Sequence, residues 1–341
     1  MQRINPDVKP FFIGAERGIE RTVLPSTEFP HELLDLHPLY RSRPWENWKT
    51  LRGAATAWSR LGRIVAAERP VCVVGTGGYA SGIALGYAAM HGIPYAVQEQ
   101  NSFPGLTTKF FSRYARQVHN GFPEAASLLK PGARTKLFDS GNPIEPPPEP
   151  RPEKSLARAS WGFPASGGRV MLIYGGSQGS KAINDVVAAW VKQGIPDDLF
   201  VIWATGRITH ADYASLETER VRIRAYLSPM IDAYSATDFA LSRGGAMATA
   251  ELCAWGIPPI VVPLPTAAAD HQTANARALA AAGAAELIPQ KDLTVESLDR
   301  SVRALLEDPN LLEQRSAAVL RRARPHAAEQ IARHVLELAA G

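Results

Sequence analysis

The apolar positions of this chain form short runs that alternate with longer amphipathic stretches. The short runs, bounded by glycine, proline or charged residues, predict buried strands. They are Phe11–Gly14, Leu33–Leu39, Val71–Val74, Tyr95–Glu99, Val170–Tyr174, Phe200–Ala204, Val221–Arg224, Phe239–Leu241 and Ile257–Pro263. The stretches that predict helices are Ala15–Leu24, Trp45–Ala67, Ser81–Met90, Thr107–Ala115, Ala182–Lys192, Ala246–Ala254, Asp270–Ala282 and Ala327–Ala339. This alternation predicts an α/β protein with parallel sheets and helices on both faces.

The sharpest change in composition is a proline-rich segment from Ser140 to Pro152. Proline lacks the amide hydrogen that strands and helices need, so this segment predicts a linker between two domains. We expect a first domain over residues 1–142, a second over residues 143–326, and a C-terminal helix over residues 327–341 that packs back on the first domain. The expected architecture is two αβ domains joined by a hinge, with a cleft between them.

With 341 residues, of which 45% are apolar and 21% charged, the chain has the composition of a soluble globular protein of two domains. It contains no apolar run of about 18 residues, so no membrane-spanning helix is predicted. Its first residues lack the apolar core of a signal peptide, and the cytoplasm is the expected location. Cys72 and Cys253 are the only cysteines, which predicts neither a disulfide scaffold nor a zinc cluster.

The net charge of +4 is unevenly distributed along the chain. Residues 1–142 hold 17 Lys and Arg against 11 Asp and Glu, a balance of +6, which leaves 20 against 22, or −2, for residues 143–341. A basic first half predicts an anionic partner, either a membrane surface or a phosphorylated substrate. Nucleic acid is not an expected partner, because no recognised DNA- or RNA-binding motif occurs.

Polar residues and glycines gather between Leu241 and Asn275, where strand and helix patterns alternate. The glycines of the turn at 242–245 let backbone N–H groups approach an anion, and the positive end of the following helix dipole favours such a ligand. Glu251, one turn into that helix, is placed to accept hydrogen bonds from a diol such as a ribose. Polar side chains suited to sugar hydroxyls follow at Asp270, His271, Gln272 and Asn275. A helix cap, a surface acid and a polar helix start are the alternatives for single residues, but as a set they predict a nucleotide-sugar site.

A second glycine-rich turn, Tyr174–Lys181, follows a buried strand and opens a helix. Its backbone N–H groups, the Ser177 hydroxyl and the helix dipole can hold a diphosphate. It matches neither the Walker A loop nor the dinucleotide fingerprint G-x-G-x-x-G. Taken alone, the turn is equally well explained as a tight connection between a strand and a helix.

Five segments rich in glycine, asparagine and glutamine follow one another along the chain. They are Gly75–Gly82 (GTGGYASG), Glu99–Asn101 with Pro104–Leu106, Gly141–Pro143, Gly175–Gly179 (GGSQG) and Asp270–Ala276 (DHQTANA). In their order and spacing they resemble the successive motifs of the MurG-type peptidoglycan glycosyltransferases, which belong to glycosyltransferase family 28. The resemblance extends from about residue 10 to the C-terminus.

The resemblance implies the GT-B fold, in which two Rossmann-like doubly wound domains face a cleft. It also implies an inverting, metal-independent transfer of N-acetylglucosamine from UDP-N-acetylglucosamine to lipid I, the undecaprenyl-diphosphate-linked muramyl pentapeptide, giving lipid II in peptidoglycan synthesis. No cofactor is implied, and the chain has no Asp-x-Asp that would predict a bound metal. The implied location is peripheral, on the cytoplasmic face of the bacterial inner (plasma) membrane, with an anionic membrane surface as a partner.

The resemblance also assigns roles to single residues. Asn101 resembles the residue that touches the donor sugar, Ser177 the diphosphate contact, and Gln272 the glutamine on the sugar hydroxyls. Leu227 lies where the family reads uracil with backbone groups. The turn-and-helix segment that holds phosphate and ribose, with Glu251 on the ribose, matches Ala246, Met247, Ala248, Thr249, Ala250 and Glu251. The acceptor side matches Gly77, Gly78 and Tyr79, where Tyr79 either touches the acceptor or caps the turn.

The chain departs from the family pattern at three places. Gln98 replaces a usual histidine, and Glu145 replaces a usual arginine, which removes a cation near the donor. The family's first strand, its Gly-rich loop and the loop's histidine, the favoured general base, have no counterpart here. We expect a start codon assigned too far downstream or a fragment, since the loss of a central strand leaves strand edges unpaired. Glu99 is the best remaining candidate for the general base, although a carboxylate there can instead orient the acceptor.

Two further questions stay open at the level of sequence. The segments Trp45–Ala67 and Lys109–Arg116 mix aromatic and cationic residues, which indicates either a peripheral membrane face or ordinary half-buried helices. The function also has alternatives, namely another UDP-sugar enzyme of this fold (an epimerase or a glycolipid glycosyltransferase) or a truncated, inactive donor-binding protein.

Overall fold

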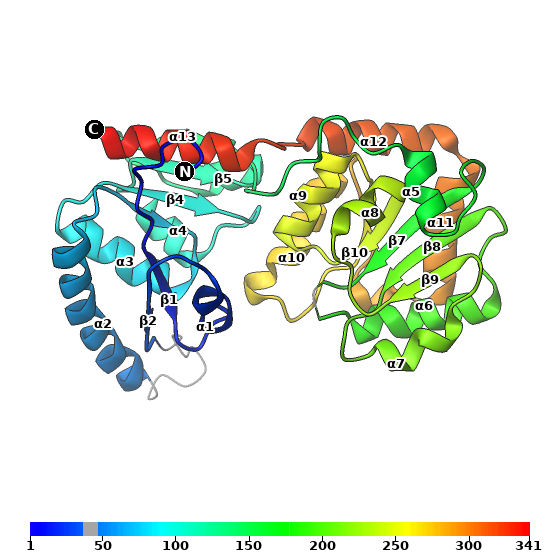
Figure 1. The fold of residues 1–341 in the computed structure, drawn as a ribbon, viewed down its shortest axis with the longest axis horizontal. Coiled ribbons are helices and arrows are strands. Elements are labelled where there is room, and N and C mark those ends of the chain that lie inside the picture. The colour runs from blue at the N-terminus through cyan, green and yellow to red at the C-terminus, as the bar shows by residue number, and fades with distance from the viewer. Residues whose placement is uncertain (37–46, 177) are drawn as a thin grey trace. The chain divides into compact units, whose positions relative to one another are not determined.

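The structure is a computed structural model, which describes residues 1–36, 47–176 and 178–341. The chain divides into two compact units. The first unit comprises Met1–Ser140 together with Ala327–Gly341, and the second comprises Gly141–His326. In Figure 1 the first unit is drawn in blue to cyan, with its C-terminal helix in red. The division lies close to the proline-rich segment that predicts a linker.

The second unit is built on a six-stranded parallel sheet with the order β12-β11-β10-β7-β8-β9. Its strands are β7 (Arg169–Tyr174), β8 (Leu199–Ala204), β9 (Val221–Arg224), β10 (Phe239–Ser242), β11 (Pro259–Val261) and β12 (Glu286–Leu287). The first strand in sequence, β7, is central, and Leu172 lies in register with Ile202 of β8 and Ala240 of β10. The chain adds β8 and β9 on one side of β7 and then β10, β11 and β12 on the other. A sheet with this order is doubly wound, and such sheets bind ligands at the carboxyl ends of their strands.

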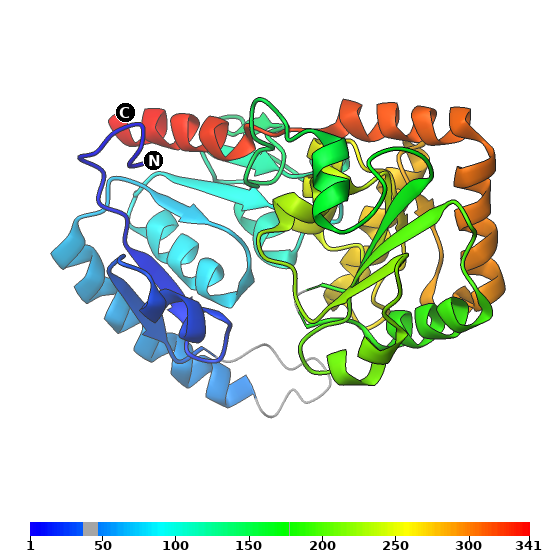
Figure 2. The same cartoon turned by 45° about the vertical axis from the view of Figure 1, so that its right-hand side comes forward.

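Helices cover both faces of this sheet, as the two views in Figures 1 and 2 show. They are α5 (Lys154–Ser160), α6 (Lys181–Gln193), α7 (His210–Tyr213), α8 (Met230–Ala236), α9 (Ala246–Trp255), α10 (His271–Ala281), α11 (Val295–Glu307) and α12 (Pro309–Arg322). Successive side chains of a strand point to opposite faces. Met171 and Ile173 of β7 therefore pack with α6 and α11, while Leu172 and Tyr174 pack with α8 and α9.

The first unit contains two parallel sheets, β1-β2 and β3-β4-β5-β6. Its strands are β1 (Phe12–Ala15), β2 (His31–Leu34), β3 (Val73–Gly75), β4 (Tyr95–Glu99), β5 (Gln117–Asn120) and β6 (Lys136–Phe138). Its helices are α1 (Glu20–Val23), α2 (Asn47–Glu68), α3 (Gly78–Met90), α4 (Leu106–Phe111) and α13 (Ala327–Ala340). Leu85 of α3 packs on the four-stranded sheet, and Tyr87 of the same helix packs with Leu61 of α2 and Leu34 of β2.

Two strand edges of the first unit lack a ladder partner within the described ranges. There β1 pairs with β2 alone, and β3 pairs with β4 alone. Phe12 on β1 and Val74 on β3 are exposed. In the second unit, by contrast, the central strand β7 has neighbours on both sides and is buried from Val170 to Tyr174. The sheet of the first unit is therefore interrupted, whereas that of the second unit is continuous.

The C-terminal helix α13 belongs to the first unit through contacts with its four-stranded sheet. Gln117 on β5 donates a side-chain hydrogen bond to the backbone oxygen of His334 over 2.8 Å. The ring of Phe138 on β6 stacks against His334 at 4.1 Å and against His119 at 5.0 Å between ring centroids. These contacts fix α13 on β5 and β6.

Several elements are shorter than the sequence pattern predicts. The helix expected over residues 15–24 is reduced to the four residues of α1, because Gly18 disfavours its start and Pro25 ends it. The helix expected over residues 107–115 ends at Phe111, after which the chain turns into β5. The strand expected over residues 33–39 is β2, which ends at Leu34, and the positions from residue 37 lie outside the described residues. The buried run at 257–263 forms a ladder only over β11.

Candidate functional site

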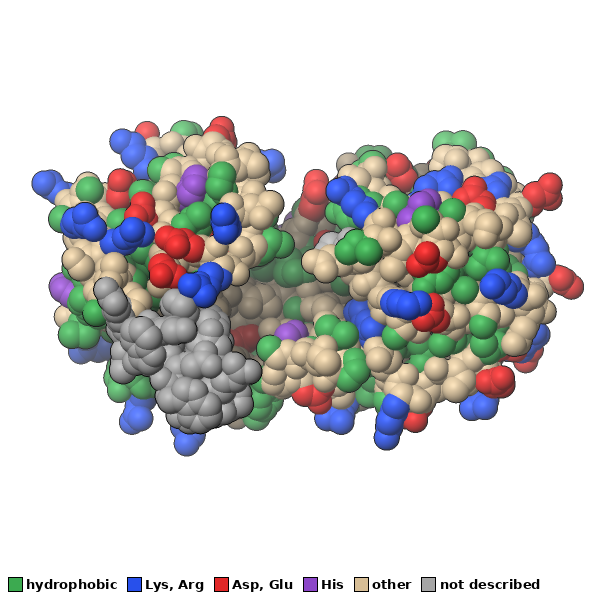
Figure 3. Space-filling model, turned by 90° about the horizontal axis from the view of Figure 1, so that it is seen from below, with side chains coloured by type: hydrophobic (Ala, Val, Ile, Leu, Met, Phe, Trp, Pro, Cys, Tyr) green, Lys and Arg blue, Asp and Glu red, His purple; other side chains and the backbone are tan. Residues whose placement is uncertain are grey.

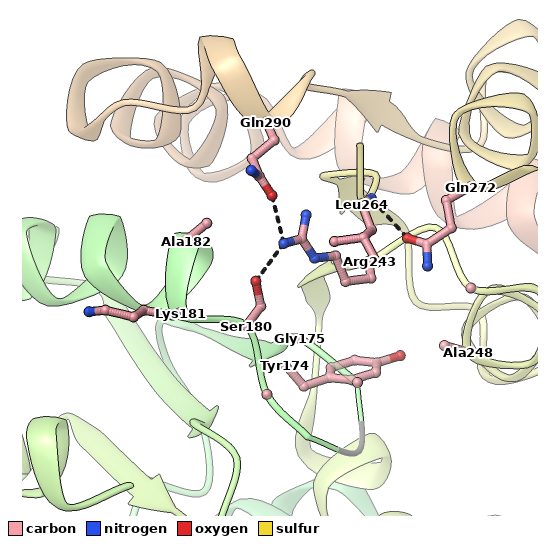
Figure 4. Close-up of a pocket in the computed structure, with 13 residues that line it drawn as sticks. Tyr174, Gly175, Ser180, Lys181, Ala182, Arg243, Ala248, Leu264, Gln272 and Gln290 are labelled. Atoms are coloured by element: carbon pink, nitrogen blue, oxygen red, sulfur yellow. Dashed lines mark hydrogen bonds between the residues drawn. The ribbon is translucent and has the colours of Figure 1, made fainter. Parts of the chain in front are cut away.

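A pocket of ≈ 430 Å³ lies in the second unit at the carboxyl ends of β7 and β10. The glycine-rich turn after β7, the start of α6 and the start of α9 line it. Figure 4 shows how the side chains from these elements converge. The lining residues are Tyr174, Gly175, Gly176, Gly179, Ser180, Lys181, Ala182, Arg243, Gly245, Ala248, Leu264, Gln272 and Gln290.

Arg243, the residue after β10, is a buried cation in the wall of this pocket. Its guanidinium donates to Ser180 Oγ over 2.6 Å and to Gln290 Oε1 over 2.7 Å, the two bonds drawn in Figure 4. It also donates to the backbone oxygens of Val262 and Pro263. Because Arg243 is only 8% exposed, burial lowers the pKa of its guanidinium. All four acceptors are neutral oxygens, so the positive charge is available to an anion in the pocket.

Two positions of the turn after β7 have backbone conformations that favour glycine. Gly176 and Gly179 have φ angles of +93° and +78°. A Cβ atom at Gly179 would lie 2.1 Å from the backbone oxygen of Thr205. Ser180 then caps α6 by accepting a hydrogen bond from the N–H of Ile183. The turn therefore brings the N-terminal end of α6 to the pocket, where its dipole favours a negatively charged group.

The start of α9 forms the opposite part of the lining. Gly245 is its N-cap residue, and the side chain of Thr249 donates back to the backbone oxygen of Gly245 over 3.0 Å. Asn275 of α10 donates to the backbone oxygen of Gly244 over 3.1 Å. The first N–H groups of α9 have no intrahelical acceptor, so they are available to a ligand. Two helix starts and a buried cation thus line one pocket, which suits a diphosphate.

Two polar side chains near the pocket are held by hydrogen bonds. Gln272 accepts from the backbone N–H of Leu264 with Oε1 over 3.0 Å, which leaves its amide N–H groups to serve as donors. Glu251, on the second turn of α9, accepts from the hydroxyl of Tyr234 over 2.7 Å. An amide donor and a carboxylate acceptor are the groups that recognise sugar hydroxyls.

In the first unit, the candidate residues lie on the loops that follow β3 and β4. Glu99 is buried at the end of β4, and its two carboxylate oxygens accept from the backbone N–H groups of Asn101 and Gly105, each over 3.0 Å. Gln100 donates to the backbone oxygen of Thr76 over 2.8 Å, which ties the two loops together. Gly77 precedes α3 and Gly78 begins it, both with positive φ. Through these two hydrogen bonds Glu99 holds the conformation of the loop at residues 101–105.

Comparison with known proteins identifies the family. The model of the glycosyltransferase family 28 N-terminal domain matches residues 1–120, and the model of the family's C-terminal domain matches residues 170–331. The chain belongs to glycosyltransferase family 28.

Curated family 28 relatives align with nearly the whole chain. A protein of Chlorobium limicola is 35% identical, and one of Prosthecochloris aestuarii is 34% identical; each alignment covers 99% of this chain and 93% of the relative. Both relatives are named UDP-N-acetylglucosamine–N-acetylmuramyl-(pentapeptide) pyrophosphoryl-undecaprenol N-acetylglucosamine transferase. The crystal structure of Acinetobacter baumannii MurG superposes with a TM-score of 0.76 at 26% identity, covering 98% of this chain and 93% of that one.

The family 28 residues expected from the sequence occupy different kinds of position. Ala248 and Gln272 line the pocket, and Glu251 lies on the same helix as Ala248. The side chain of Leu227 is buried in the core cluster that includes residues of α8, and the expected role of its backbone groups stays a prediction. Ser177 and the Tyr79 side chain lie outside the described part of the structure. The role of Glu99 as a general base stays a prediction.

The sequence did not single out three residues that line the pocket, Ser180, Arg243 and Gln290, or Tyr234, which bonds to Glu251. Two of them carry a usable signal. Ser180 directly precedes an amphipathic helix, as N-cap residues do, and Arg243 is a charge between a buried strand and two glycines. Tyr234 and Gln290 have no such local signal, because each acts through a contact distant in sequence. Within the described ranges, no group of three or more His, Cys, Asp or Glu side chains could hold a metal ion.

Proposed function

We propose that this chain transfers N-acetylglucosamine from UDP-N-acetylglucosamine to lipid I, the undecaprenyl-diphosphate-linked muramyl pentapeptide. The structural observation that carries the proposal is the convergence of buried Arg243 with the starts of α6 and α9 in one pocket. Relatives at 34% and 35% identity are named as transferases of this kind, which favours transfer over epimerisation.

The chemistry follows from the charge that develops on the leaving group. As the bond between the sugar and the β-phosphate breaks, negative charge grows on the departing UDP. Preorganised N–H groups at the helix starts and the fixed charge of Arg243 stabilise that charge without a metal ion. In this proposal the phosphates and ribose lie along the segment from Ala246 to Glu251, and the uracil lies against the backbone at Leu227. Gln272, Asn101 and Ser177 contact the sugar and diphosphate.

The acceptor side of the proposal is formed by the first unit. Gly77, Gly78 and Tyr79 lie where the acceptor would bind, and Glu99 is the candidate for activating its hydroxyl. Since both carboxylate oxygens of Glu99 accept backbone hydrogen bonds, its contribution includes holding the loop that carries Asn101.

The lipid-linked acceptor requires a membrane, and α4 carries side chains suited to its surface. Four apolar side chains on and beside α4 are strongly exposed: Phe103 (39%), Leu106 (65%), Phe110 (65%) and Tyr114 (60%). Lys109 lies 3.8 Å above the Phe103 ring, and Arg113 follows on the same segment. Apolar side chains flanked by cations bind anionic membrane surfaces. We propose that this group, the α4 patch, places the protein peripherally on the cytoplasmic face of the bacterial plasma membrane.

Among the described residues, no helix combines the length and the apolar character that a bilayer crossing requires. Figure 3 shows acidic and basic side chains interspersed over the face it draws, without a broad field of one sign. The proposed membrane contact rests on the exposed apolar side chains of the α4 patch.

Product analysis tests the proposal directly. The purified chain is incubated with UDP-N-[¹⁴C]acetylglucosamine and lipid I in detergent, and label in the lipid fraction and released UDP are measured together. We expect equimolar transfer of label and release of UDP, and a strong loss of both in Glu251→Ala. Recovery of the labelled sugar as an epimer, or an unchanged donor with wild-type protein, would contradict the proposal.

A further inference from the structure

The carboxylate of Glu251 is held by a tyrosine on a neighbouring helix. The hydroxyl of Tyr234 on α8 donates to Oε2 of Glu251 on α9 over 2.7 Å. Tyr234 is 4% exposed and belongs to the core between the sheet and these two helices. Within the described ranges, Oε1 of Glu251 makes no hydrogen bond. One oxygen of the carboxylate is thus held by Tyr234, which leaves the other as a hydrogen-bond acceptor.

The surroundings of Tyr234 keep its hydroxyl protonated. Burial raises the pKa of Tyr234 well above its ordinary value, and the neighbouring phenol of Tyr174 and the charge of Glu251 raise it further. A protonated phenol can donate at any physiological pH, and an ionised carboxylate can only accept. The direction of the hydrogen bond is therefore fixed. A free glutamate side chain would instead lose rotamer freedom on binding a ligand, which weakens binding.

We propose that Tyr234 is a positioning residue for recognition of the ribose. It holds Oε2 of Glu251 so that Oε1 faces the 2′- and 3′-hydroxyls of the donor nucleotide. The inference rests on the proposed function, since it places a uridine diphosphate in the pocket. Tyr234 itself does not touch the ligand, so its effect should depend on the hydroxyls that Glu251 binds.

A comparison of two nucleotides isolates this effect. Calorimetry measures the Kd of UDP and of 2′,3′-dideoxy-UDP for wild type and Tyr234→Phe, a substitution that keeps the ring and removes only the hydroxyl. We expect wild type to prefer UDP, and the variant to bind UDP about tenfold more weakly while its affinity for the dideoxy nucleotide changes less than about twofold. The same substitution in a Glu251→Ala background should have no further effect on UDP affinity.

The matched control is Ser235→Ala, which removes the next hydroxyl of α8. That hydroxyl donates to the backbone oxygen of Ile231 over 2.7 Å and does not contact Glu251, so both affinities should stay at the wild-type values. An equal weakening of both nucleotides by Tyr234→Phe, or an unchanged UDP affinity, would overturn the positioning role and leave the proposed function intact. A wild-type protein without UDP affinity would overturn both.

Discussion

The guanidinium of Arg243 donates to the hydroxyl of Ser180 over 2.6 Å, so the residue that follows β10 is tied to the residue that caps α6. The two residues are far apart in sequence but lie at the ends of neighbouring parallel strands. The same guanidinium reaches Gln290 and two backbone oxygens. The Arg243 side chain therefore joins the segments that line the pocket and also gives the pocket a positive charge.

Removal of Arg243 should destabilise the second unit and weaken nucleotide binding. Arg243→Ala leaves buried acceptors without a donor, so we expect the free energy of unfolding in urea to fall by about 2–3 kcal/mol. Arg243→Lys should recover only part of this loss, because an ammonium cannot reproduce the fork of the guanidinium. The exposed pair of Arg303 with Asp299 provides the control, and Arg303→Ala should cost less than about 1 kcal/mol. Equal losses at the two positions would contradict the role given to Arg243.

Two glycines with similar backbone angles should respond differently to a methyl group. Gly179 and Gly167 have φ angles of +78° and +80°, but only Gly179 would place a Cβ against a backbone oxygen. Gly167→Ala should cost about 1 kcal/mol of stability, from the left-handed conformation alone. Gly179→Ala should cost about 3–4 kcal/mol and weaken UDP binding, since the turn must move. Urea unfolding and calorimetry measure the two effects, and similar values for both variants would be inconsistent with this account.

Glu99→Gln separates loop positioning from proton transfer. The amide has only one acceptor oxygen, so it cannot accept from the N–H groups of both Asn101 and Gly105 as the carboxylate does. If Glu99 acts through the loop, the KM for UDP-N-acetylglucosamine should rise about tenfold, while the pH profile of kcat keeps its shape. Steady-state kinetics across pH 5.5–9 provides the readout. Loss of the acidic limb of kcat, together with a fall of kcat by about a hundredfold or more, would instead identify Glu99 as the base.

The stacked histidine beneath α13 should make the first unit sensitive to acid. Burial, and next the neighbouring His334, lower the pKa of His119 from 6.5 to about 4. Between these values the unfolded chain binds a proton that the folded unit does not, so stability is complete above pH 6.5 and declines as the pH falls toward 4. The decline attributable to His119 is up to about 3 kcal/mol. Urea unfolding at several pH values should show a flatter profile for His119→Gln than for wild type, and an unchanged profile would contradict this account.

Acidic residues introduced into the α4 patch should reduce membrane binding. Leu106→Glu and Phe110→Glu each place a charge where an apolar side chain would enter the interface, so we expect partitioning to fall about tenfold or more for each. Flotation with vesicles containing phosphatidylglycerol measures this. Leu156→Glu is the matched control, because Leu156 is similarly exposed (67%) but lies on α5 of the second unit. Equal binding by all three variants would exclude the α4 patch as the membrane contact.

Two of the strands that the sequence pattern predicts are observed with the expected bounds at both ends. They are β4, which is buried along its whole length, and β9, in which apolar and charged residues alternate. Where the predicted bounds of an element are wrong, the cause can be a local one. In α1 a glycine and a proline shorten a helix that periodicity alone extends. Strand order and the interruption between β1 and β3 depend on pairing across the chain, which no local pattern encodes.

The candidate site likewise has features that the local sequence predicts and features that it does not. Glycine turns and polar helix starts are local features, so the turn at Gly175–Gly179 and the residues of α9 and α10 could be found from sequence. The contacts of Arg243 with Ser180 and of Tyr234 with Glu251 join separate elements of the second unit. Both depend on strand order and helix packing, so they become visible only in the folded unit.

The return of α13 to the first unit has a consequence for how the protein is made. The second unit is one uninterrupted stretch of chain, so all of its residues emerge from the ribosome in succession and it can fold during translation. The first unit is completed later, because α13, which contacts Gln117 and His119, is translated after the second unit. The unit whose synthesis begins first is therefore the later of the two to complete its fold.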